Sequence, residues 1–146
     1  MSTLDKAIMI ASEAHAGQLD KSGQRYILHP MRLMQKFVRE EERIVAVLHD
    51  VVEDSNVSLN DLKTYGFAKS IIDAIDCLSK RNNESYDGFI ARISSNYLAK
   101  KIKIEDLKDN LDLTRLTSIT DSDLVRIKKY HKALINFLEL ANSNIE

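Results

Sequence analysis

Four titratable side chains follow an apolar run in this chain, and their spacing suits the binding of a cation. His49 and Asp50 come directly after the apolar residues 44–48, and Glu53 and Asp54 follow after two valines. On a helix, residues four positions apart lie on one face, which places His49 next to Glu53. Burying such groups without partners would cost several kcal/mol each, and a bound cation would satisfy them. Carboxylates that merely cap a helix end would give the same pattern, so this segment alone leaves both interpretations open.

Two other segments contain side chains that bind metals or anions. His29 precedes the single proline and ends a stretch without helical periodicity, which we interpret as an ordered loop and which also contains Lys21 and Ser22. Asp106 and Asn110 lie one helical turn apart in a later stretch, so we expect them to face the same cavity.

The order of these motifs resembles the HD-domain superfamily, most closely the hydrolase domains of RelA/SpoT-type alarmone enzymes and their small stand-alone relatives. The resemblance is carried by His29-Pro30, then by the His-Asp-x-x-Glu-Asp motif at 49–54, then by Asp106 with Asn110 four residues on. It runs from about residue 4 to about residue 140. It implies an all-α fold, with one HD-domain helical bundle over residues 1–146.

The resemblance also implies a role for each matched residue. The implied metal ligands are His29, His49, Asp50 and Asp106. The implied acidic pair that handles the attacking water is Glu53 and Asp54. The implied substrate-binding residues are Lys21, Ser22 and Asn110. Members of the family are typically manganese-dependent and remove the 3′-pyrophosphate from guanosine tetra- or pentaphosphate. We therefore expect one divalent ion, Mn²⁺ with Fe²⁺ or Zn²⁺ as alternatives, and a small nucleotide as the substrate.

The sequence departs from the family pattern at three positions. Asp20 stands where many alarmone hydrolases have an arginine that helps to hold the nucleotide. Glu105 stands where a small residue is usual, and Asp109 where an aromatic residue or a histidine is common. A carboxylate at position 20 would repel a polyphosphate or accept hydrogen bonds from a base. We expect Asp20 to retune the pocket away from the strongest alarmone hydrolysis without affecting the metal.

Three functions fit these observations. The first is a (p)ppGpp 3′-pyrophosphohydrolase, which the His-Asp-x-x-Glu-Asp motif favours. The second is an HD-domain phosphatase acting on another nucleotide, such as a nucleoside monophosphate or the 2′-phosphate of NADPH, which Asp20 favours. The third is a non-catalytic sensor module with the same fold, whose signature would be the loss of a ligand or of the acidic pair.

Helices must position these residues, because the sequence has one proline and four glycines, too few for the turns of an all-β fold. Apolar periodicity predicts a bundle of about six to eight helices. The expected helices cover about 4–14, 30–38, 41–53, 58–66, 71–78, 86–93, 99–116 and 121–141. Within them, Lys100, Lys101 and Lys103 are expected to form a solvated face.

Composition narrows the class of protein further. With 146 residues, 44% of them hydrophobic, the chain is long enough to bury a core as one domain. The net charge of -1 gives no basic footprint for nucleic acid. The lone cysteine, Cys77, cannot form an internal disulfide, and no signal peptide or membrane-spanning stretch is evident. We therefore expect a cytoplasmic protein without nucleic-acid or membrane partners, and its oligomeric state stays open.

Overall fold

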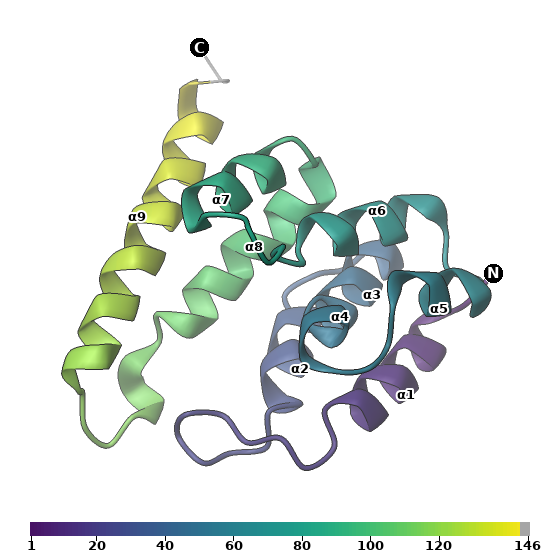
Figure 1. Ribbon diagram of the computed structural model, residues 1–146, viewed down its shortest axis with the longest axis horizontal. Helices are drawn as coiled ribbons and strands as arrows, with labels where there is room; N and C mark the ends of the chain where they lie inside the picture. The colour runs from purple at the N-terminus through teal and green to yellow at the C-terminus, as the bar shows by residue number, and fades with distance from the viewer. Residues whose placement is uncertain (144–146) are drawn as a thin grey trace.

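The computed structural model describes residues 1–143, and these residues form helices connected by loops (Figure 1). The helices are α1 (Leu4–Ala14), α2 (Leu28–Met34), α3 (Glu40–Leu48), α4 (Val51–Asp54), α5 (Leu59–Thr64), α6 (Lys69–Cys77), α7 (Tyr86–Ser94), α8 (Tyr97–Asn110) and α9 (Asp121–Ser143), with a 3₁₀ turn η1 (Leu113–Arg115). With the single turn α4 counted as an extension of α3, eight helices span the described part of the chain. The predicted all-α class is confirmed.

Helix α3 runs through the centre of the bundle and sets the depth of the site. Its residues Val45, Ala46, Val47 and Leu48 are fully buried. It packs against α1 and α2, which precede it in the sequence, and against α6 and α8, which follow it. Because the core surrounds the end of α3, the polar residues His49 and Asp50 that follow Leu48 lie in the interior of the protein.

The helix predicted at 41–53 is interrupted, and the interruption contains two of the predicted ligands. Helix α3 ends at Leu48, His49 and Asp50 form a turn, and α4 begins at Val51. The His49 imidazole folds back on α3, where its Nδ1 lies 2.7 Å from the Ala46 carbonyl oxygen. This contact satisfies a carbonyl group that has no partner within the helix. It also fixes which ring nitrogen faces away from α3.

Two other helix ends near the site differ from the prediction. Helix α2 begins at Leu28, two residues before the expected start at the proline, so His29 lies in its first turn. A proline is tolerated there because the first helical N–H groups have no partner within the helix. Helix α8 ends at Asn110 and not at residue 116, because the chain turns into η1, where the Asp112 side chain accepts from the Thr114 amide. Asp106 and Asn110 therefore occupy the last turns of α8.

No helix among the described residues is both long and apolar enough to cross a membrane.

The Ser58–Asp61 pair forms the capping box expected at the start of α5.

Candidate metal centre and active site

Three of the predicted ligands form a compact, buried group. One side-chain ligand atom from each of His29, His49 and Asp106 lies within 4.8 Å of the others, and all three residues are buried. Asp106 Oδ1 is 2.8 Å from His29 Nε2 and 3.5 Å from His49 Nε2. The three residues come from the start of α2, the end of α3 and the last turns of α8. The packing of these helices therefore assembles the group.

The fourth predicted ligand, Asp50, lies beside this group. Its Oδ2 is 2.9 Å from His49 Nε2 and 3.9 Å from His29 Nε2. The Tyr26 hydroxyl donates a hydrogen bond to the same oxygen, which fixes the direction of the carboxylate. Two imidazoles and two carboxylates thus converge, although Asp50 lies outside the tight three-residue group.

The donor atoms fit a divalent cation. His49 Nδ1 contacts a backbone carbonyl oxygen, so the ring proton belongs on Nδ1 and the Nε2 lone pair faces Asp50 and Asp106. His49 Nε2 is buried and makes no hydrogen bond. A lone pair facing carboxylate oxygens is unfavourable unless a positive charge lies between them. Metal-binding histidines have this arrangement, with one nitrogen held by a hydrogen bond and the other directed at the ion.

The pKa values indicate the same need for positive charge. Burial lowers the pKa of His49, but the charges and contacts of Asp50 and Asp106 together outweigh this effect, and the pKa lies well above its usual value. Burial likewise lowers the pKa of His29, and the contacts with Asp106 and Asp109 more than reverse it. Burial raises the pKa of Asp106, whereas Lys103 and the two histidines hold it well below the usual range. Without a metal, protons on the imidazoles balance the carboxylates, and a divalent ion would replace those protons.

The predicted acidic pair lines the cavity next to this group. Glu53 Oε1 accepts a hydrogen bond from the backbone amide of Lys80, in the loop between α6 and α7. The side-chain amide of Gln18 donates a hydrogen bond to the backbone oxygen of Asp54 at 2.9 Å, which connects α4 to the loop after α1. Burial raises the pKa of both carboxyl groups, and the nearby Asp50 charge raises it further. A carboxylate with a raised pKa is a better proton acceptor, as a general base requires.

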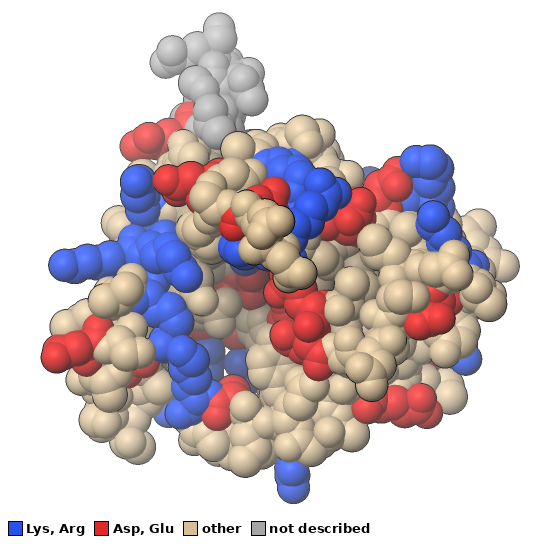
Figure 2. Space-filling model, in the orientation of Figure 1, with Lys and Arg blue, Asp and Glu red and all other residues tan. Residues whose placement is uncertain are grey.

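A cavity of about 500 Å³ opens above these residues, a size typical of small-molecule sites. Acidic side chains gather around the hollow in the middle of the face that Figure 2 shows, and basic side chains lie to its left, on the side of α9. Eight of the nine predicted site residues line this cavity: His29, Asp50, Glu53, Asp54, Asp106, Lys21, Ser22 and Asn110. His49 lies beneath it, in the metal-binding group. The structure thus brings all nine together, and their individual roles stay predictions.

The three residues predicted to bind substrate have different surroundings. Burial lowers the pKa of Lys21, and the nearby Arg126 of α9 lowers it further, so the loop and α9 face each other across the cavity. The Ser22 hydroxyl donates to Asp20 at 2.7 Å. Asn110 Nδ2 donates to Asp106 Oδ1 at 3.1 Å. Of these three side chains, only that of Lys21 forms no hydrogen bond or ion pair with the described residues.

The Asp20 side chain stabilises the loop that contains Lys21. Its Oδ1 accepts hydrogen bonds from the Ser22 amide at 2.9 Å, the Ser22 hydroxyl at 2.7 Å and the Gln24 amide at 2.9 Å. Burial raises the pKa of Asp20, but these hydrogen bonds lower it below its usual value overall. The residue that the sequence suggested as a recognition element therefore also has a structural role.

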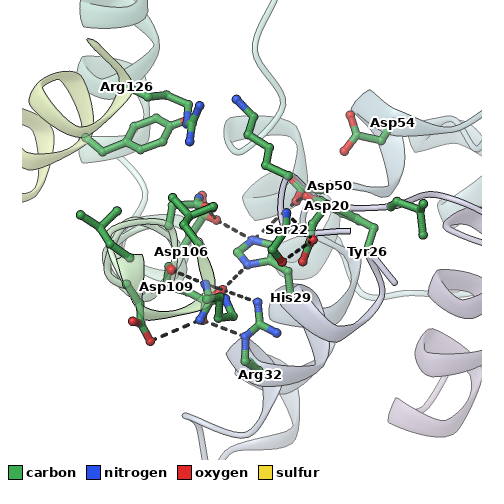
Figure 3. A pocket seen from close by; sticks show the side chains of 18 of the residues that line it. Asp20, Ser22, Tyr26, His29, Arg32, Asp50, Asp54, Asp106, Asp109 and Arg126 are labelled. Atoms are coloured by element: carbon green, nitrogen blue, oxygen red, sulfur yellow. Dashed lines mark hydrogen bonds and ion pairs between the residues drawn. The ribbon is translucent and has the colours of Figure 1, made fainter. Parts of the chain in front are cut away.

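Three further residues contact the site and were not predicted to belong to it. Tyr26 holds Asp50, and the Lys103 ammonium group lies 2.9 Å from Asp106 Oδ2. Lys103 is largely buried beneath the Phe89 ring, so its prediction as part of a solvated face is wrong. Asp109 contacts His29, as Figure 3 shows. Spacing offered a signal for Lys103 and Asp109, because both lie three residues from Asp106 on the same helix.

Comparison with known proteins agrees with this arrangement. No family model matches the chain. It is 36% identical over 81 residues to a guanosine-3′,5′-bis(diphosphate) 3′-pyrophosphohydrolase of Vibrio cholerae, a match that covers 53% of this chain and 11% of that protein. It is 35% identical over 81 residues to the bifunctional (p)ppGpp synthase/hydrolase SpoT of Escherichia coli, with the same coverage. The chain thus aligns with only about a ninth of the length of these relatives.

A longer match and a solved structure extend the similarity. A pyrophosphohydrolase of the same name from Aquifex aeolicus is 25% identical over 120 residues, which cover 74% of this chain and 17% of that protein. The structure of a metazoan ortholog of SpoT superposes with a TM-score of 0.74 at 20% identity and covers 94% of this chain and 86% of that one. The resemblance to RelA/SpoT-type hydrolase domains, which the motifs predicted, is thus confirmed in sequence and in fold.

Proposed function

We propose that this chain is an HD-type, metal-dependent phosphohydrolase domain whose substrate is guanosine tetra- or pentaphosphate, from which it removes the 3′-pyrophosphate. The observation that carries the proposal is the buried group of His29, His49 and Asp106 directly beneath a nucleotide-sized cavity. The acidic pair at the edge of that cavity and the names of the matched relatives support it. We propose Mn²⁺ as the ion and Asp50 as the fourth ligand.

Each residue has a task in this reaction. The ion, when bound, supplies positive charge that polarises the scissile phosphate and activates water. Glu53, fixed by the Lys80 amide, accepts the proton of the attacking water, and Asp54 orients that water. Lys21 binds phosphate oxygens from the opposite wall of the cavity. Asn110 keeps Asp106 directed at the ion through its hydrogen bond.

Product analysis tests this function directly. Manganese-loaded protein is incubated with guanosine tetraphosphate, and the phosphate species that is released is identified. Pyrophosphate together with guanosine diphosphate is the expected result. The absence of turnover, with metal bound and the protein folded, would contradict the proposal.

A second candidate is a phosphatase that releases orthophosphate from another nucleotide, such as a nucleoside monophosphate or the 2′-phosphate of NADPH. The observation that favours it is that most cations of the cavity are already paired. Arg32 and Arg115 contact Asp109, and Arg126 contacts Asp123. Lys103 contacts Asp106, so Lys21 alone among the lining lysines and arginines has no ion pair within residues 1–143. Release of orthophosphate in place of pyrophosphate across a nucleotide panel would establish this alternative.

A further inference from the structure

The two histidines of the metal group are held by different kinds of partner. His49 Nδ1 contacts a neutral backbone oxygen, that of Ala46. His29 Nδ1 contacts a carboxylate, with Asp109 Oδ2 at 2.6 Å. Figure 3 shows the His29 ring between Asp106 and Asp109, which both project from α8. The resemblance to the family gives no carboxylate at position 109, so this contact is a property of this chain.

The carboxylate of Asp109 is itself fixed from two sides. Arg32 Nε lies 2.9 Å from Asp109 Oδ1, and Arg32 Nη2 lies 2.9 Å from Oδ2. Arg115 Nη2 lies 2.7 Å from the Asp109 backbone oxygen and 3.4 Å from Oδ2. The forked contact with Arg32 restricts the plane of the carboxylate. Asp109 therefore has little freedom to turn away from His29.

We infer that Asp109 is a positioning residue for the metal, which keeps the His29 proton on Nδ1 and directs Nε2 at the ion. This inference rests on the proposed function, because it assigns a task toward the same metal. Carboxylate partners of this kind orient a metal-binding histidine and make it a stronger ligand, and their loss typically weakens metal affinity 10–100-fold. Arg32 and Arg115 act one step further out by holding Asp109.

The experiment is a titration of metal-free protein with Mn²⁺ by calorimetry, for the wild type and Asp109→Asn. The substitution keeps the shape of the side chain, but it removes the negative charge and replaces one accepting oxygen with an NH₂ donor. That donor would face either the N–H of His29 or the N–H groups of Arg32. We expect the dissociation constant to rise about 10–100-fold. The matched control is Asp112→Asn, because Asp112 lines the same cavity and contacts Arg115 but not His29. We expect a change of less than threefold there.

A second readout separates positioning from general stability. Co²⁺-saturated Asp109→Asn should show a shifted visible absorption band, because the direction of one imidazole ligand changes. An unchanged Mn²⁺ affinity with an unchanged Co²⁺ spectrum would overturn the inference, as would an equal loss of affinity in Asp112→Asn. If Asp109→Asn does not fold, Arg32→Gln replaces it, and unchanged Mn²⁺ affinity in that variant would also overturn the inference. Failure of the wild type to bind Mn²⁺ would instead contradict the proposed function.

Discussion

Metal removal should destabilise this protein by an amount that depends on pH. The buried group of His29, His49 and Asp106 would bind the ion only in the folded state, because the three residues come from separate helices. Binding to the folded state alone stabilises by about 2.7 kcal/mol when the free ion is at about a hundred times its dissociation constant. For a chain of this length each kcal/mol moves Tm by roughly 2–4 °C. The expected difference between metal-loaded and chelator-treated protein is therefore about 5–11 °C.

The direction of the pH dependence follows from the histidine pKa values. The folded pKa of His29 and of His49 lies above the usual value near 6.5. A raised folded pKa stabilises the metal-free protein below that value, and this stabilisation is lost as the pH rises through the folded pKa. The ion competes with the same protons, so its affinity falls as the pH falls. The metal-induced shift in Tm should therefore be small near pH 6 and should grow as the pH rises.

Thermal unfolding followed by circular dichroism, with Mn²⁺ or with a chelator at several pH values, measures this shift. Elemental analysis should give about one ion per chain. His49→Ala should abolish the shift, whereas His131→Ala, which changes an exposed histidine on α9, should keep it. A Tm that is the same with and without Mn²⁺ at every pH, or a shift that shrinks as the pH rises, would refute the reasoning.

Two further substitutions separate catalysis from recognition. Glu53→Gln should lower turnover about a hundredfold or more while metal content is unchanged, because it removes the proton acceptor but no predicted ligand. Near-normal turnover in a product assay would show that Glu53 is not the proton acceptor. Asp20→Asn keeps an oxygen for the loop hydrogen bonds but removes the negative charge of the side chain. We therefore expect kcat/KM for guanosine tetraphosphate to rise about fivefold, which corresponds to the loss of a repulsion on the order of 1 kcal/mol. A fall in kcat/KM would mean that the Asp20 charge contributes to recognition.

The sequence predicted the helical class and the residues that converge, because both depend on patterns that are local or ordered along the chain. Apolar periodicity located the helices, and the His-Asp-x-x-Glu-Asp motif located the turn after α3. The contact of His29 with Asp109 joins residues 80 positions apart, and periodicity carries no information about such pairs. Lys103 was misread for a related reason: a lysine in a basic run is usually solvated, and only the packing of α7 and α9 against α8 covers this one.

Two of the three departures from the family pattern, Asp20 and Asp109, line the cavity, and both add negative charge to it. Its lining holds seven carboxylates against five lysine and arginine side chains, an excess of two negative charges when the histidines are neutral. At a pH above the folded pKa values of His29 and His49, an anionic nucleotide would be repelled from such a site in the metal-free protein. A divalent ion would cancel that excess and would place its charge at the floor of the cavity, where a phosphate must lie for hydrolysis. A bound metal would therefore have a second task besides chemistry, because its charge would allow the cavity to bind an anionic substrate.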